Sequence, residues 1–159
     1  FSEATYVDNC SVTQPSSYLP SVFDDRLYLP VVSVGIDVVD ISTPTAPTHV
    51  TLIESTYARY MAAQDNFGYL CDDAEGLRIL NITDIENPIE VATYNPATVR
   101  HFTVDGSYGY LSTIGDGIHV LDISNPLAPV SVCNYTHVNA TNTLQTQKVG
   151  DFLFALEFG

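Results

Sequence analysis

The chain has 159 residues, of which 19 are acidic and five are lysine or arginine, so its formal net charge at pH 7 is −14. So few cations cannot form the basic patch that neutralises phosphates, which excludes nucleic acids and anionic membrane surfaces as partners. Hydrophobic residues make up 45% of the chain, enough for one globular domain with a sizeable core. No apolar run approaches the roughly eighteen residues of a membrane span.

The first twenty residues precede the regular pattern, and we divide the chain into an N-terminal segment, 1–20, and a repeat region, 21–159. Residues 4–7 have the β-branched and aromatic content of a short strand, and residues 11–13 are a weaker candidate. We expect such a strand to close the repeat array or to be donated to a neighbouring subunit.

Short strands separated by turn residues are predicted from residue 21 onwards. In the clearest set, residues 99–104 alternate apolar and polar side chains, as half-buried strands do. Asp105-Gly106 then predicts a hairpin turn. Pro126 and Pro129 mark the end of a strand, because proline cannot donate to a sheet ladder. The expected strands include 21–23, 26–32, 99–104, 108–112, 118–123, 130–135, 144–149 and 151–155.

One eight-residue sequence motif recurs at a fixed interval. Its copies begin at Gly35, Gly76 and Gly117, which are 41 residues apart. A four-stranded unit of about forty residues is the size of a propeller blade. The sequence therefore predicts an all-β fold of four-stranded antiparallel blades of about 41 residues, in an incomplete β-propeller-like repeat array. Tyrosines with the same spacing are Tyr28, Tyr69 and Tyr110.

The three copies read GIDVVDIS at 35–42, GLRILNIT at 76–83 and GIHVLDIS at 117–124, each followed by a proline-containing turn. In these phrases the chain resembles the LVIVD repeat family. The resemblance covers roughly residues 23–159 and implies β-propeller-type blades of the kind found in secreted and cell-surface proteins. It implies no shared catalytic motif. The second copy departs from the pattern, with Asn81 where the others have aspartate.

The number of blades does not close a ring. Residues 144–149 and 151–155 account for only the first two strands of a fourth blade, whereas propellers have about four to eight complete blades. One interpretation is that these residues are part of a longer chain. The other is that strands from elsewhere complete the last blade, which would otherwise leave an unpaired edge. Head-to-tail donation that does not close into a ring would produce a filament.

Four sequons for N-linked glycosylation are present, which suggests a secreted glycoprotein. Two of them lie at or inside a polar insertion after the third blade, where we expect a surface loop. The accidental occurrence of such sequences in a threonine-rich β protein is the alternative. The acceptors are Asn9, Asn81, Asn134 and Asn139.

The cysteines are odd in number, namely Cys10, Cys71 and Cys133. An odd set in a secreted chain leaves one thiol free or paired between chains. All three pairings are open. A disulfide between Cys10 and Cys133 is our first choice, because Cys71 lies in an apolar strand and suits a small buried side chain.

Catalytic, cofactor and metal sites are not indicated. The four histidines have no metal-ligand spacing, and no nucleophile or phosphate-binding motif is present. The acidic run 72–75 is the best cluster, but it lacks the alternation of a calcium loop, so we interpret it as a solvated hairpin turn. We therefore expect a protein that is not an enzyme and needs no cofactor.

The sequence as a whole suggests an extracellular or cell-surface structural protein. The leading hypothesis is a subunit of a surface assembly in which homo-oligomers form through unpaired blade edges and β-strand sharing, with a filament as the form that an unclosed assembly takes. The alternative is an adhesion or binding module from a longer cell-surface propeller that recognises protein or glycan. A propeller enzyme whose active site needs further blades is a third hypothesis.

Overall fold

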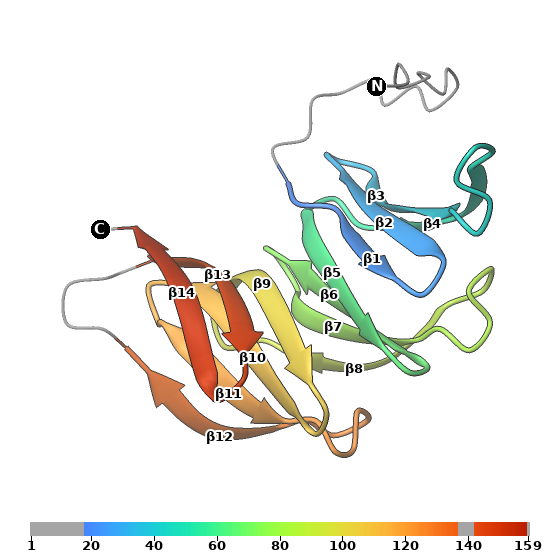
Figure 1. Ribbon diagram of the computed structural model, residues 1–159. Coiled ribbons are helices and arrows are strands. Elements are labelled where there is room, and N and C mark those ends of the chain that lie inside the picture. Colours follow the sequence, from blue (N-terminus) through green and yellow to red (C-terminus); the bar gives the residue numbers. More distant parts are fainter. Residues whose placement is uncertain (1–17, 137–141, 159) are drawn as a thin grey trace.

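The computed structural model describes residues 18–136 and 142–158, which contain fourteen β-strands and no helix. Consecutive strands form three four-stranded antiparallel units, which we call blades 1 to 3. Blades 1 and 2 are separate sheets, whereas the C-terminal hairpin joins blade 3 to make a six-stranded sheet. Figure 1 shows these units beside one another in chain order, from blue to red. The predicted all-β fold of four-stranded blades in an incomplete propeller-like array is confirmed.

The strands of each blade pair with their neighbours in sequence order. Blade 1 consists of β1 (Ser21–Phe23), β2 (Arg26–Val31), β3 (Gly35–Asp40) and β4 (Thr48–Glu54). Blade 2 consists of β5 (Ala58–Gln64), β6 (Phe67–Asp72), β7 (Gly76–Asn81) and β8 (Ile89–Tyr94). Blade 3 consists of β9 (Thr98–Asp105), β10 (Tyr108–Ile114), β11 (Ile118–Asp122) and β12 (Val130–Tyr135). The C-terminal hairpin consists of β13 (Asn142–Val149) and β14 (Phe152–Phe158).

The first two strands of each unit are joined by a tight turn with a fixed backbone requirement. In blade 3 the turn lies one residue later than predicted, because Asp105 pairs with Tyr108 and the turn consists of Gly106 and Ser107. Gly106 has a φ of 59°, and glycine adopts this left-handed conformation without a steric penalty. The equivalent residues, also with positive φ, are Asp24, Asp65 and Gly150.

The hydrophobic core lies between successive blades. Tyr28, on blade 1, and Met61, on blade 2, belong to the cluster that joins those two blades. Tyr69 and Phe102 belong to the cluster that joins blades 2 and 3, with their ring centroids 5.1 Å apart. In blades 1 and 2 the recurring tyrosine therefore packs against the blade that follows it. Burial raises the pKa of Tyr69 to about 12.

The junction between blade 3 and the C-terminal hairpin is polar instead. Thr146 lies four residues before Gly150, the first residue of the hairpin turn. Met61 and Phe102 lie four residues before the first turn residues of blades 2 and 3. A threonine therefore occupies the position at which the two earlier junctions have a large apolar side chain. Thr103 Oγ1 donates to the Thr146 carbonyl oxygen at 2.7 Å and lies 3.0 Å from its hydroxyl. The hairpin pairs with β10 through a single bridge, between Ile114 and Asn142.

The residue that ends the third strand of each blade forms a local turn. Asp40 Oδ1 accepts a hydrogen bond from the Ser42 backbone amide at 2.8 Å, and Asn81 Oδ1 accepts one from Thr83 at 2.9 Å. Hydrogen bonds from Ser42 lower the pKa of Asp40. Aspartate and asparagine both form this Asx turn, which explains why Asn81 replaces aspartate without changing the fold. The equivalent pair in blade 3 is Asp122 and Ser124.

Candidate functional site

The C-terminal hairpin has an open edge. In blades 1 to 3 the second strand is paired on both sides, but β14 pairs only with β13 among the described residues. An unpaired strand exposes backbone N–H and C=O groups that can pair with another strand. This edge is the candidate assembly site of the molecule.

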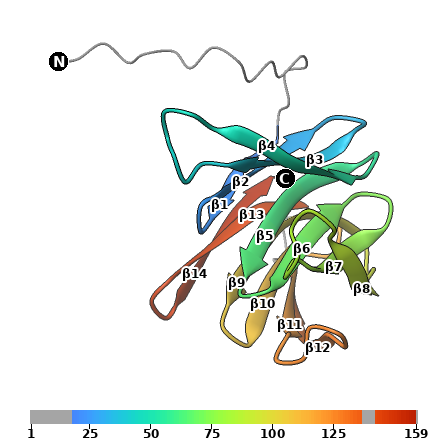
Figure 2. The same ribbon diagram turned by 90° about the vertical axis from the view of Figure 1, so that its right-hand side faces the viewer.

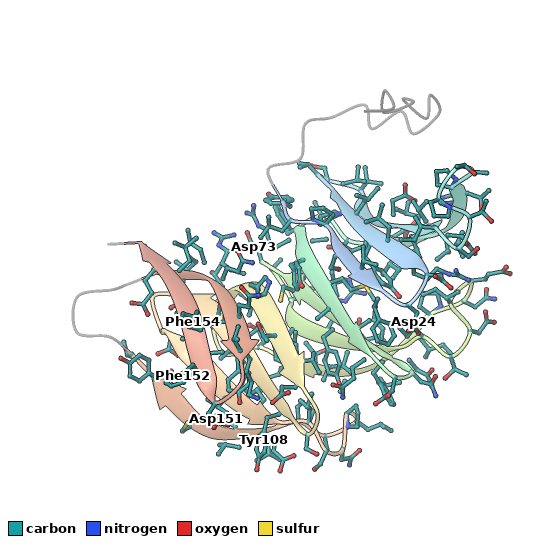
Figure 3. The ribbon with its side chains drawn as sticks, in the orientation of Figure 1. Asp24, Asp73, Tyr108, Asp151, Phe152 and Phe154 are labelled. Carbon is teal, nitrogen blue, oxygen red and sulfur yellow. The ribbon has the colours of Figure 1, made fainter. Side chains whose placement is uncertain are left out.

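The same strand carries a row of exposed apolar side chains. Phe152, Phe154 and Leu156 alternate along β14 and are 72%, 60% and 59% exposed. Figure 3 shows Phe152 and Phe154 along the outer side of the hairpin. We call these three side chains the β14 apolar row. Because strand residues two apart point to the same face, the row lies on one side of the hairpin.

The repeat shows what normally covers these positions. Counted from the turn residue with positive φ, Phe154 stands where blade 2 has Tyr69, which is 2% exposed. Phe152 and Leu156 correspond in the same way to Phe67 and Cys71, which also pack in the core between blades 2 and 3. The β14 apolar row is therefore the surface that in blade 2 is covered by the following blade.

A second feature lies at the axis, where the first strands of the units face one another. Side chains from β1, β5, β9 and β13 line a common cavity of about 380 Å³. Beside it lies a larger cavity of about 750 Å³, which we call the axial cavity. Figure 2, in which the molecule is turned by 90°, shows β5, β9 and β13 in the middle of the array. The axial cavity is lined by Tyr18, Arg59, Tyr60, Arg100, His101 and Leu144, among others.

Two of the five cationic side chains meet at this cavity. Arg59 and Arg100 are 41 residues apart and hold equivalent places on β5 and β9. Both donate hydrogen bonds to the Asp73 carboxylate. Arg59 Nε lies 2.6 Å from Oδ2, and Arg100 Nη1 lies 2.8 Å from each of the two oxygens. Arg59 also donates to the Tyr18 hydroxyl and stacks over its ring, 4.3 Å from the centroid. Figure 3 labels Asp73 near the ends of β5 and β9.

Residues 73–75 form the predicted turn, and Ala74 and Glu75 are exposed, but the interpretation of the run as solvated is wrong for Asp72 and Asp73. Asp72 is buried and accepts a hydrogen bond from Ser55 Oγ at 2.5 Å, while Asp73 is enclosed by the two arginines. The pairing with Asp73 was missed in the sequence because the arginines come from other strands. The equal spacing of Arg59 and Arg100 was the one available signal.

His101 and Tyr60 form one wall of the axial cavity. Their rings stack with centroids 4.0 Å apart, and His101 Nδ1 has no hydrogen-bond partner within the described residues. Burial lowers the pKa of His101 to about 4, so the imidazole is neutral at physiological pH.

A further set of hydrogen bonds joins Tyr94, His119 and Asp116. The Tyr94 hydroxyl lies 3.1 Å from His119 Nδ1, and His119 Nε2 lies 2.8 Å from Asp116 Oδ2. Asn134 donates to the other oxygen of Asp116 at 3.1 Å. Within residues 18–136 and 142–158, no group of three His, Cys, Asp or Glu side chains has metal-binding geometry.

The predicted modification sites are dispersed. Asn134 is exposed on the outer strand β12, whereas Asn81 is partly buried at the end of β7 and holds an Asx turn. Asn9 and Asn139 lie outside the described residues. Glycosylation at all four positions stays a prediction.

The cysteines differ in accessibility. Cys133 is exposed on β12 and Cys71 is buried, and neither forms a disulfide with another described residue. Burial raises the pKa of Cys71 above its usual range. Cys10 lies outside the described residues, so its disulfide with Cys133 stays a prediction.

The described residues include no helix long and apolar enough to cross a bilayer. No curated protein sequence matches the chain. Among solved structures, the crystal structure of the computationally designed Ika4 protein is similar in fold, with a TM-score of 0.63 and 11% sequence identity. The alignment covers 88% of this chain and 86% of that one.

The sequence profile of the LVIVD repeat matches this chain three times, at residues 21–54, 55–96 and 98–137. The matches correspond to the three complete blades and include the recurring glycine phrases. They span well over half of the sequence, and the chain therefore belongs to the LVIVD repeat family.

Proposed function

We propose that the protein is a non-enzymatic structural subunit of an extracellular or cell-surface assembly, joined to its neighbours by β-strand sharing at β14. The observation that carries this proposal is the β14 apolar row, which is exposed here although the corresponding side chains of blade 2 are buried.

The edge and the row together define what a partner must supply. It must pair its backbone with β14, and it must cover Phe152 and Phe154 with apolar side chains. In blades 1 and 2 both tasks belong to strands of this same repeat. A second copy carries such strands and apolar surfaces, so we take it as the partner. Covering three large apolar side chains supplies a favourable hydrophobic term of about 1.5–3 kcal/mol for each.

The polar junction supports the same role. The hairpin is held to blade 3 by hydroxyl hydrogen bonds, a single strand bridge and the Lys148–Asp105 ion pair at 2.6 Å. A unit with so little apolar burial gains more from an added strand than a complete blade does. Extracellular placement rests on the sequons and on the family resemblance, and the exposed Asn134 is an accessible glycan acceptor.

The test is the assembly state of matched variants. Phe154→Lys places a charge in the β14 apolar row, and Val132→Lys does the same at a side chain of similar exposure, 55%, on β12. Negative-stain electron microscopy and light scattering should show assemblies for the wild type and Val132→Lys but dispersed subunits for Phe154→Lys. Assemblies that persist in Phe154→Lys, or a wild type that stays monomeric, would overturn the proposal.

A deletion identifies the donated strand. If residues 1–17 supply it, the chain lacking them should remain folded but fail to assemble. Addition of the corresponding peptide should then occupy β14 and block assembly of the intact chain. Unchanged assembly of the deletion variant would assign the strand to another part of the neighbouring copy.

A further inference from the structure

We propose that the axial cavity binds a carboxylate carried on an apolar or aromatic group, with Arg59 and Arg100 as the residues that bind the carboxylate. This inference does not rest on the proposed assembly, because Arg59 and Arg100 bind the carboxylate and neither belongs to the β14 apolar row; the two sites share only Leu156, which also lines the cavity.

The charge of the site points to an anion. The chain has nineteen acidic and five basic residues, yet at this cavity two arginines share one carboxylate, Asp73. The cluster keeps one net positive charge. Charges elsewhere on the acidic surface are screened beyond about 8 Å at physiological ionic strength, so the local charge decides what binds.

One arginine of the site has N–H groups that make no hydrogen bond to the described residues. Arg100 uses only Nη1 to contact Asp73, and its Nε and Nη2 have no hydrogen-bond partner within the described residues. Those groups belong to a side chain that lines the cavity. A guanidinium with unused N–H groups is suited to a carboxylate, which accepts two parallel hydrogen bonds from it.

The walls of the cavity specify the rest of the ligand. Tyr60 stacked on His101 presents an aromatic surface, and Ile114, Leu144 and Leu156 add aliphatic ones. His101 is neutral and 6% exposed, so this wall adds no competing charge. A volume of about 750 Å³ lies within the range of small-ligand sites. The combination of cationic and apolar groups favours an amphipathic carboxylate over inorganic anions.

The first experiment is a calorimetric titration of the intact chain with 3-phenylpropionate, using 3-phenylpropanol as the uncharged control. We expect the acid to bind and the alcohol to bind at least about tenfold more weakly, since it makes no charge-assisted hydrogen bonds. Equal binding of the two compounds, or no binding of the acid at millimolar concentration, would overturn the proposal.

Variants locate the site. Arg100→Gln should weaken binding of the acid by about tenfold, and Arg26→Gln, which changes an arginine on blade 1 paired with Asp40, should leave it unchanged. Leu144→Glu is a second test should Arg100→Gln fail to fold, because Leu144 is 39% exposed and the new carboxylate would repel the ligand. Binding that survives both Arg100→Gln and Leu144→Glu would place the ligand elsewhere and refute the assignment.

The carboxylate could belong to a free small molecule or to an acidic side chain of a protein segment. N-acetyl-Phe-Asp-amide, whose only carboxylate is an aspartate side chain, separates these sources. Tighter binding of the dipeptide than of 3-phenylpropionate would assign the cavity to a protein segment, and the reverse order would assign it to a small molecule. Either result supports the carboxylate site, provided that Arg100→Gln weakens the binding of both compounds.

Discussion

Gly76 and Tyr94 approach so closely across the second blade that a Cβ atom on Gly76 would lie 2.7 Å from the Tyr94 carbonyl oxygen. Gly76 also has a φ of 89°, which side chains rarely adopt. A glycine is therefore required at this position for two reasons: the backbone has a positive φ, and there is no room for a Cβ atom. The other copies, Gly35 and Gly117, face the same obstacle from Ile53 and Tyr135.

We expect Gly76→Ala to lower the free energy of unfolding by about 2–4 kcal/mol, because strain and a backbone collision add. Gly106→Ala is the matched control. It has positive φ, but a Cβ there meets nothing within 4 Å, so only the conformational cost of about 1 kcal/mol should appear. Urea denaturation measures both, and equal losses would contradict the collision argument.

Asp73→Asn should destabilise the fold by about 2 kcal/mol, since it leaves Arg59 and Arg100 facing each other without the carboxylate between them. Asp40→Asn is the comparison, because it also removes an aspartate paired with an arginine but keeps the Asx turn, as Asn81 does in blade 2. Its effect should be clearly smaller. A similar loss in both variants would show that Asp73 is an ordinary surface partner.

His101 should make stability depend on pH. Its pKa is about 4 in the folded protein and 6.5 for a free side chain, so between these values only the unfolded chain takes up a proton. Stability is therefore complete above pH 6.5 and falls as the pH decreases towards 4, by up to about 3 kcal/mol.

His101→Phe retains an aromatic ring beside Tyr60 but cannot titrate. The difference in unfolding free energy between wild type and variant should change across pH 4 to 6.5 and be constant above it. A difference that is constant throughout this window would show that His101 is not protected from protonation.

Hydrogen exchange should distinguish the C-terminal hairpin from the blades. Because β13 and β14 rest on a polar junction and one strand bridge, their amides should exchange faster than those of β6 and β7 in dispersed subunits. If assembly occurs through β14, protection should rise there and stay unchanged in blade 2. Protection of β14 equal to that of β6 in the dispersed subunit would contradict a weakly held hairpin.

Two substitutions of Asn81 separate its role in the Asx turn from its role as a predicted glycosylation site. Asn81→Asp removes the sequon but keeps an oxygen for the Thr83 amide, as Asp40 and Asp122 do for theirs, so stability should be retained. Asn81→Ala loses the turn as well and should cost about 1 kcal/mol. Mass spectrometry of the native protein then shows whether Asn81 carries a sugar.

The sequence alone determined the blades. Turn residues, the period of two and the 41-residue interval act locally, so the strands 99–104, 108–112 and 130–135 were placed to within a few residues. The backbone requirement at Gly76 and the Asx turns repeat with each unit, which explains why the motif recurs at this interval. The hairpin turn was displaced by one residue because positive φ falls on its first position, where the glycine stands.

Only the tertiary structure decided which side chains meet between units. Arg59 and Asp73 meet within blade 2, where β5 pairs with β6, and Arg100 joins them only when blade 3 packs against blade 2. Phe154 looks like any core aromatic in the sequence. Its exposure follows from the polar junction at Thr146 and from the open edge of β14, beside which no other described strand lies. Burial depends on the neighbouring elements and not on the residue itself.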